Sequence, residues 1–270
     1  MILKGCCAIV TGSGGTGCGR AIALRLAAEG AVVIVSDTNS AGGEETLRLI
    51  ESSGGRAVFR AADMRVESQV RDLMSFAAND CGPLGVLVNN ATAPFAHSYE
   101  MENWLATVET DFIGPLVATR YAVEAMRQAR QGGAIVNISS ISALWHGRRT
   151  PAGAPVYDAA KAGLLRLTTG LAELAKTDNI RVNCLAPGWI ATGGAREYWE
   201  SLTPEERADR GVPASLLTTA QIADAVVRLA TDDSLAGRVL FWWSDDEPKL
   251  LAWGDRGYKA ASAFSLSLAD

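Results

Sequence analysis

The chain has 270 residues, 48% of them hydrophobic and 20% charged, so it can bury one large core, and we expect a single domain over residues 1–270. Its net charge of −5 argues against nucleic acid or an anionic membrane surface as a partner, because either needs a basic patch. No apolar run approaches the ~20 residues that span a bilayer, and the N-terminal apolar stretch is too short for a signal sequence, so we expect a cytoplasmic protein without membrane contact.

Seven short apolar runs predict buried parallel strands, because continuous rather than alternating hydrophobicity is typical of strands covered on both faces. In chain order, the third being more mixed than the others, they begin at Cys6, Ala31, Arg56, Leu84, Gly133, Ile180 and Arg238. Segments with helical spacing lie between them, among them residues 19–30, 67–80 and 161–176. The alternation predicts an α/β fold with a doubly wound sheet of about seven parallel strands, helices on both faces and a ligand crevice at the carboxyl ends of the strands.

The turn between the first strand and the first helix, TGSGGTGCGR at residues 11–20, contains five glycines. A glycine-rich turn here lets backbone N–H groups approach a pyrophosphate, and the helix N-terminus adds about half a positive charge. Glycines also mark ordinary tight turns, so the loop alone fits either role.

The five cysteines show no metal-ligand spacing and the chain has only two histidines, so we expect no metal site. Cys18 lies at a helix N-terminus, where the pKa of a thiol can fall. We interpret it and the other four as reduced structural residues.

The second strand ends in IVSDTN, eighteen residues after Gly19. This spacing places Asp37 where a carboxylate accepts hydrogen bonds from the adenosine ribose of NAD. The 2′-phosphate of NADP would be repelled by this carboxylate, by roughly 4 kcal/mol for unit charges about 4 Å apart at an effective dielectric of about 20. Asp37 therefore favours NAD. An isolated aspartate at a strand end is often only a turn former, and it is the pairing with the glycine loop that favours the cofactor.

The stretch YDAAK places Tyr157 and Lys161 four residues apart, on one face of a helix that we expect to begin near Pro155. A cation within about 4–6 Å can lower the pKa of a tyrosine by one to three units. Such a phenol can exchange a proton with an alcohol or a ketone. The same spacing also occurs incidentally on exposed helices.

Five stretches in this order make the chain resemble the short-chain dehydrogenase/reductase family over nearly its whole length. They are VTGSGGTGCGRAIALRLAAEGA, NNA at 89–91, IVNISS ending at Ser140, YDAAK, and RVNCLAPGWIAT ending at Thr192. The resemblance implies a Rossmann-like NAD-binding domain, hydride transfer, and a homotetramer or homodimer. It also implies that Tyr157 is the acid/base, that Lys161 lowers its pKa and holds the nicotinamide ribose, and that Ser140 hydrogen-bonds the substrate oxygen.

The resemblance further implies cofactor contacts. Asp63 and Met64 would meet the adenine, Asn90 and Ala91 would line the ribose site, and Ile190 and Thr192 would hold the carboxamide. The remaining implied contacts are with the glycine loop and the end of the second strand, at Gly12, Ser13, Gly17, Cys18, Gly19 and Asp37.

Three departures from the family pattern bear on the site. Four residues rather than three separate Gly12 from Gly17, and we expect the extra residue to bulge outward. Thr92 stands where the family has glycine, and Asp111 stands where it has the asparagine of its catalytic tetrad. We expect Asp111 to lie near Lys161 and to keep the pKa of Tyr157 higher; a protonated or helix-capping Asp111 is the alternative.

Three other segments bear on the substrate. Residues 189–218 lack a strand signal, and we expect a lid or substrate loop there, with plain surface helix as the alternative. Residues 143–153 and 238–270 are atypical of the family. The tryptophans of these segments suit an apolar or aromatic substrate, a subunit interface or core packing: Trp145, Trp189, Trp242, Trp243 and Trp253. Arg148 and Arg149 fit either an anionic group of the substrate or solvated loop charges.

The sequence as a whole predicts an NAD-dependent alcohol dehydrogenase or ketone reductase of the short-chain type. Its substrate would be a small-molecule secondary alcohol or ketone. The alternative is an NAD-binding sensor or scaffold with weak catalysis, which only Asp111 and Thr92 favour.

Overall fold

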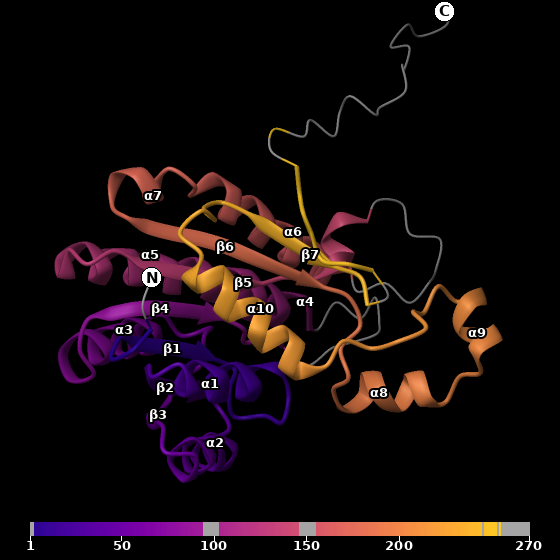
Figure 1. Ribbon diagram of the computed structural model, residues 1–270, viewed down its shortest axis with the longest axis horizontal. Helices are drawn as coiled ribbons and strands as arrows, with labels where there is room; N and C mark the ends of the chain where they lie inside the picture. Colours follow the sequence, from indigo (N-terminus) through magenta and orange to yellow (C-terminus); the bar gives the residue numbers. More distant parts are fainter. Residues whose placement is uncertain (1–2, 94–102, 146–154, 245, 253, 255–270) are drawn as a thin grey trace, which may run out of the picture.

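The computed structural model describes residues 3–93, 103–145, 155–244, 246–252 and 254. Within them, an eight-stranded sheet forms the centre of the molecule, with the order β3-β2-β1-β4-β5-β6-β7-β8 (Figure 1). The strands are β1 (Cys7–Thr11), β2 (Val32–Asp37), β3 (Arg56–Ala61), β4 (Leu84–Asn89), β5 (Gly133–Ile138), β6 (Ile180–Pro187), β7 (Val239–Trp242) and β8 (Lys249–Leu250). All seven expected parallel strands are confirmed, and β8, two exposed residues antiparallel to β7, is an addition.

The helices between the strands cover both faces of the sheet. They are α1 (Cys18–Ala28), α2 (Ser40–Ser52), α3 (Glu67–Asp80), α4 (Trp104–Val108), α5 (Gly114–Ala129), α6 (Pro155–Gly170), α7 (Leu174–Thr177), α8 (Gly193–Glu200), α9 (Pro204–Asp209) and α10 (Thr219–Thr231). Among the helices of the described ranges, none combines the length and apolar character that a membrane crossing requires.

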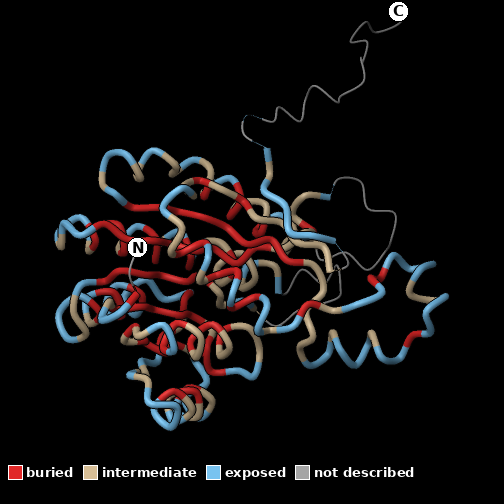
Figure 2. The backbone as a smooth tube through the Cα atoms, viewed as in Figure 1, coloured by how far each residue is buried: buried red, intermediate tan, exposed pale blue. Residues whose placement is uncertain are grey.

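Two cores lie on opposite faces of the sheet because successive strand side chains point to opposite sides. On β1, Ala8 and Val10 join the core under α1 and α10, while Cys7 and Ile9 join the core under α3 and α5. The central strands are therefore buried throughout, and the outer faces of the helices are exposed (Figure 2). A strand that serves both cores is apolar at most positions, which explains the continuous apolar runs.

The order of the strands reverses beside β1. The chain runs from β1 outward to β2 and β3, then returns to β4 on the other side of β1. In a parallel sheet, the loops that leave β1 and β4 diverge at such a point and leave a crevice at the carboxyl ends. Thr11 and Asn89 end these two strands, and the loops after them carry the glycines and Asn90.

The segment from Trp189 to Thr218 contains α8 and α9 rather than an open loop. A parallel bridge between Ile190 and Leu217 joins its two ends. Figure 1 shows α8 and α9 standing away from the sheet at the crevice side. The sequence interpretation gave surface helix here only as the alternative to a loop, because eight and six residues are too short for a clear periodic signal. The segment's role as a lid stays a prediction.

Candidate active site

The glycine loop connects β1 to α1, and it has no room for a side chain at Gly12 or at Gly19. Gly12 has a φ of +67°, and a Cβ there would lie 2.6 Å from the Ala91 Cα. A Cβ at Gly19 would lie 2.1 Å from the Gly12 carbonyl oxygen. Gly17 is the N-cap of α1 and gives it no side-chain cap, and the first turn of that helix holds no acidic residue. This helix N-terminus therefore presents its positive end to the loop without compensation.

The extra residue of the loop projects outward, as expected. Gly14 stays tied to the end of β2, since its N–H donates a 2.7 Å hydrogen bond to Asp37 Oδ2. Gly15 and Thr16, which follow it, are exposed, and a Cβ at Gly15 would meet only the Gly17 N at 3.9 Å. The exposed residues thus lie outside the close contact between Gly12 and Gly19 at the entry into α1.

Polar side chains brace this loop from the protein side. Asn90 donates from Nδ2 to the carbonyl oxygens of Thr11 and Gly12 at 2.9 and 3.0 Å. Ser13 is fully buried, and its hydroxyl donates to the Val10 carbonyl at 2.8 Å. The Ser13 side chain therefore points into the protein, where it supports the loop.

The other residues implied at the cofactor site lie at or just after the ends of β2 and β3. Asp37 accepts from the Asn39 N–H at 2.9 Å in addition to Gly14, so it also forms the turn that ends β2. The Asp63 carboxylate pairs with Arg65, which lowers the pKa of Asp63 through hydrogen bonds. Met64 is buried in the core that α3 and α5 cover.

Residues after β6 come back to the glycine loop. Thr192 is the N-cap of α8, and a Cβ at Gly17 would lie 3.7 Å from its methyl carbon. Ile190, two residues earlier, forms the bridge to Leu217. The structure therefore brings the last family motif beside the first, although 175 residues separate Gly17 from Thr192.

The Cys18 thiol is not activated at its helix N-terminus, because burial raises its pKa to about 11. Burial likewise raises the pKa of Cys6 to about 11 and that of Cys184 to about 12. All five cysteines are free thiols. The interpretation of Cys18 as a structural residue agrees with these properties.

Tyr157 and Lys161 lie in the first two turns of α6, which begins at Pro155 as expected. Lys161 Nζ is 5.4 Å from the centre of the Tyr157 ring. The Lys161 side chain is only 4% exposed, and its Nζ donates to the Ile138 carbonyl at the end of β5 at 3.1 Å. The helix and the end of the strand thus hold the cation against the phenol.

Asp111 forms an ion pair with Lys161, with 2.9 Å between Oδ1 and Nζ. Its side chain is fully buried and also accepts hydrogen bonds from the Thr92 hydroxyl at 2.6 Å and the Ala93 N–H at 3.0 Å. Asp111 lies in a π-helical turn, Glu109–Ile113, between α4 and α5. Pro115 accounts for this turn, because it has no N–H to bond the carbonyl of residue 111 four positions earlier.

The pKa of Tyr157 is raised above its usual value, and burial of the phenol is the largest cause. The positive charge of Lys161 lowers it, while the negative charge of Asp111 raises it again. A hydrogen bond with Ser140 lowers the pKa and the charge of Asp158 raises it. Asp111 therefore opposes the activation of Tyr157 by Lys161.

Ser140 follows β5 and caps a short 3₁₀ helix, Ile141–Leu144, by accepting from the Ser142 N–H at 3.2 Å. Trp145 comes directly after this helix, and its ring centre lies 5.6 Å from that of Trp243. The segment that carries Ser140 therefore leads directly to the paired rings of Trp145 and Trp243.

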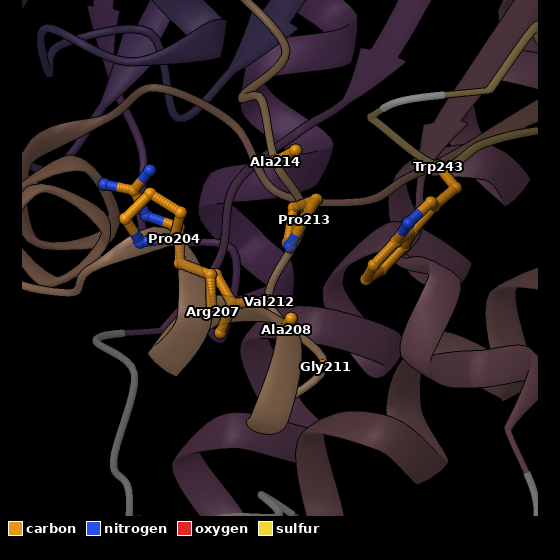
Figure 3. Close-up of a pocket in the computed structure, with 8 residues that line it drawn as sticks. All are labelled: Pro204, Arg207, Ala208, Gly211, Val212, Pro213, Ala214 and Trp243. Carbon is orange, nitrogen blue, oxygen red and sulfur yellow. The ribbon is translucent and has the colours of Figure 1, made fainter.

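A cavity of about 420 Å³ opens between α9 and Trp243 (Figure 3). Figure 3 shows the Trp243 indole facing Ala208 and Pro213 across it, so this part of the lining is apolar. The Arg207 guanidinium instead lies 3.4 Å over the Trp199 ring and donates to the Trp199 carbonyl. The cavity thus combines the segment of residues 189–218 with the C-terminal segment.

The sequence interpretation missed the contact between Thr92 and Asp111. Both were singled out as departures from the family pattern, but nothing in a spacing of 19 residues indicated that their side chains meet. Thr11 was also missed: its hydroxyl accepts from the backbone N–H groups of Asn90 and Ala91. Arg148, Arg149 and Trp253 lie outside the described residues.

Known proteins are similar to this one over most of the chain. A model of the family described as short chain dehydrogenase matches residues 6–203. Cis-4-hydroxycyclohexanecarboxylate dehydrogenase of Sinomonas cyclohexanicum is 33% identical over 243 residues, which cover 88% of this chain and 89% of that protein. L-rhamnose 1-dehydrogenase (NAD(P)(+)) of Azotobacter vinelandii is 35% identical over 252 residues, covering 91% of this chain and 92% of that protein.

A solved structure shares the fold. A 7α-hydroxysteroid dehydrogenase complexed with NADH and 7-oxo glycochenodeoxycholic acid superposes with a TM-score of 0.78 at 28% identity, covering 89% of this chain and 93% of that one. The two relatives and this structural neighbour are all dehydrogenases. The family match extends over well more than half of the chain and includes both the glycine loop and α6. This protein therefore belongs to the short-chain dehydrogenases, a family of oxidoreductases that use a nicotinamide cofactor.

Proposed function

We propose that this protein is an NAD-dependent dehydrogenase that interconverts a secondary alcohol and its ketone, with Tyr157 as the acid and base. The observation that carries the proposal is the position of Tyr157 between Lys161, 5.4 Å from its ring centre, and Ser140, which hydrogen-bonds it. A half-buried phenol beside a buried cation suits the exchange of a proton with a neighbouring oxygen.

In the oxidation direction, the ionised Tyr157 takes the proton of the alcohol hydroxyl while Ser140 donates a hydrogen bond to the same oxygen. Lys161 stabilises the phenolate through its charge. In the reduction direction, Tyr157 returns the proton to the forming alkoxide. NAD, when bound, supplies the site that accepts or donates the hydride.

Features of the crevice support NAD as the cofactor. The loop of Gly12, Ser13, Gly17, Cys18 and Gly19 has no room for a side chain at Gly12 or at Gly19, and it meets a helix N-terminus without an acidic residue, which suits a pyrophosphate. Asp37 ends β2 beside that loop, where a carboxylate suits a ribose and repels a 2′-phosphate.

Other contacts are proposed from the resemblance. Asp63 and Met64 would lie at the adenine, and Asn90 and Ala91 at the ribose. The carboxamide would lie at Ile190 and Thr192.

The part of the cavity that Trp243, Ala208 and Pro213 line supports a substrate with an apolar ring. Trp243, Ala208 and Pro213 offer flat and aliphatic surface without a charge directed into the space between them. The names of two similar proteins describe ring compounds, a hydroxycyclohexanecarboxylate and an oxo bile acid. We therefore propose a cyclic secondary alcohol or its ketone as the substrate class.

The test is reduction of NAD over a panel of cyclic and linear secondary alcohols, with Tyr157→Phe as the diagnostic variant. Removing the phenol oxygen should lower kcat by roughly 10²- to 10⁴-fold while NAD affinity stays within a few-fold, because only the proton carrier is lost. Tyr121→Phe is the matched control, since its hydroxyl bonds the exposed Glu67 on α3 and none of the proposed catalytic residues lies on α3 or α5. Turnover of Tyr157→Phe within a few-fold of the unmodified protein would reject the assignment.

A second candidate function is an NAD-binding sensor or scaffold with weak catalysis. The ion pair between Asp111 and Lys161 favours it, because it offsets part of the field that activates Tyr157. Tight NAD binding by calorimetry without turnover of any alcohol or ketone in the panel would support this candidate over the dehydrogenase.

We also propose that the protein is a homodimer or homotetramer. The support is the exposure of three large apolar side chains on α4, the π-helical turn and the start of α5, namely Leu105, Ile113 and Leu116. Light scattering coupled to gel filtration measures the state directly, and a monomer would refute the proposal.

A further inference from the structure

The two residues that depart from the family pattern, Thr92 and Asp111, meet through one oxygen of the Asp111 carboxylate. The Thr92 hydroxyl donates a 2.6 Å hydrogen bond to Asp111 Oδ1, and Lys161 Nζ lies 2.9 Å from the same oxygen. The Ala93 N–H donates to the other oxygen, Oδ2, at 3.0 Å. A cation and a hydroxyl therefore share Oδ1.

Burial makes the hydroxyl important. The Asp111 side chain has no exposure to water, so protein groups must satisfy its charge, whereas Thr92 itself is exposed. The other acceptor within reach of the Thr92 hydroxyl, the Ala93 carbonyl, is 3.5 Å away, at the limit of a hydrogen bond. The Thr92 proton is thus directed to Asp111.

We propose that Thr92 is a positioning residue of the active site, whose hydroxyl fixes the Asp111 carboxylate and takes up part of the charge on Oδ1. Lys161 is then only partly neutralised and keeps a positive field at Tyr157. Without the hydroxyl, Oδ1 has Lys161 as its only side-chain partner, and the two charges cancel more completely.

The groups that face Tyr157 come from three elements. Lys161 and Asp158 lie on its own helix, Asp111 on the π-helical turn, and Ser140 after β5. Of these four groups, Asp111 is the one to which the Thr92 hydroxyl donates, so we expect a change at Thr92 to reach Tyr157 through that carboxylate. Loss of the Thr92 hydroxyl should therefore raise the pKa of Tyr157, whereas loss of the Asp111 charge should lower it.

The inference rests on the proposed function for its catalytic meaning, and its test begins without substrate. The titration of Tyr157 is followed by near-ultraviolet phenolate absorbance, after subtraction of the same curve for Tyr157→Phe. The variants are Thr92→Val, which has the shape but not the hydroxyl, Thr92→Ser, which restores a hydroxyl, and Asp111→Asn with and without Thr92→Val. Thr107→Val is the matched control, because the Thr107 hydroxyl donates to the Asn103 carbonyl and, within the described ranges, to no group around Tyr157.

We expect Thr92→Val to move the Tyr157 titration upward by roughly half a pH unit or more. We expect Thr92→Ser and Thr107→Val to leave it in place, and Thr92→Val to have no effect in the Asp111→Asn background. The basic-side pKa of kcat/KM should move in parallel. An unchanged titration in Thr92→Val, an equal shift in Thr92→Ser, or a shift that persists with Asp111→Asn would overturn the inference. Inactivity of the unmodified protein would instead refute the proposed function, while the titration still tests Thr92.

Discussion

At the scale of single residues, the charges of Lys161 and Asp111 have opposite effects on the pKa of Tyr157. At 2.9 Å and an effective dielectric of about 20, the two charges attract by roughly 6 kcal/mol, so the pair is strongly coupled. The effect of Lys161 on the pKa of Tyr157 is larger than the opposing effect of Asp111. The cation therefore still activates the phenol, but less than it would beside a neutral residue.

Asp111→Asn keeps the shape of the side chain and removes its charge. Because the negative charge raises the pKa of Tyr157, its loss should move the basic-side pKa of kcat/KM for alcohol oxidation downward by several tenths of a unit or more. The measurement is a pH–rate profile of both proteins. Superimposable profiles would show that the charge is silent, and loss of activity would show that the reaction needs the acid itself.

Asp37 is the residue on which we propose that cofactor preference depends. In Asp37→Ala, repulsion of a 2′-phosphate disappears, so the preference for NAD over NADP should narrow. Affinity for both dinucleotides should also fall somewhat, because the Gly14 N–H loses its 2.7 Å acceptor. Isothermal titration with NAD and NADP measures both effects, and tighter binding of NADP by the unmodified protein would contradict the NAD assignment.

At the scale of elements, the junction of β1 and α1 is the most constrained feature of the site. Gly19 packs against the Gly12 carbonyl, whereas Gly15, four residues earlier, faces open space. The two glycines therefore have different reasons to be glycine. One permits the close approach of helix and loop, and the other belongs to the exposed insertion.

The pair Gly19→Ala and Gly15→Ala tests this difference. A methyl group at Gly19 would overlap the Gly12 carbonyl, so this variant should be destabilised by roughly 1–3 kcal/mol and should bind NAD more weakly. Gly15→Ala should leave the melting temperature and NAD affinity nearly unchanged. Thermal unfolding with and without NAD is the measurement, and equal behaviour of the two variants would refute the packing argument.

At the scale of the whole molecule, much of the sheet was predictable because each buried strand serves two cores and is therefore apolar at most positions. β8 was not, because its two exposed residues carry no hydrophobic signal and depend on pairing with β7. The neighbourhood of Tyr157, Lys161 and Ser140 followed from family motifs. The contact of Thr92 with Asp111 could not be predicted, since it depends on the path of the π-helical turn.

The cavity beside Trp243 is also a property of the whole molecule, because distant segments assemble it. Trp243→Ala should lower kcat/KM for a cyclic alcohol by roughly tenfold or more, through lost apolar contact, and should change it little for a short linear alcohol. Steady-state kinetics with the two substrates provides the comparison. An equal loss for both alcohols would indicate general damage rather than a role in ring recognition.

The segment between Ile190 and Leu217, which contains α8 and α9, has a consequence for how substrate specificity evolves. Its ends are joined by hydrogen bonds from the Ala191 N–H to the Leu217 carbonyl at 2.8 Å and from the Leu217 N–H to the Trp189 carbonyl at 2.9 Å. Within it, the Trp199 indole donates to the Pro213 carbonyl at 2.9 Å. Because its two ends are hydrogen-bonded to each other and it packs on itself, we expect that this segment can be replaced as a unit by that of a related protein. The register of the sheet and the residues around Tyr157 would then stay the same.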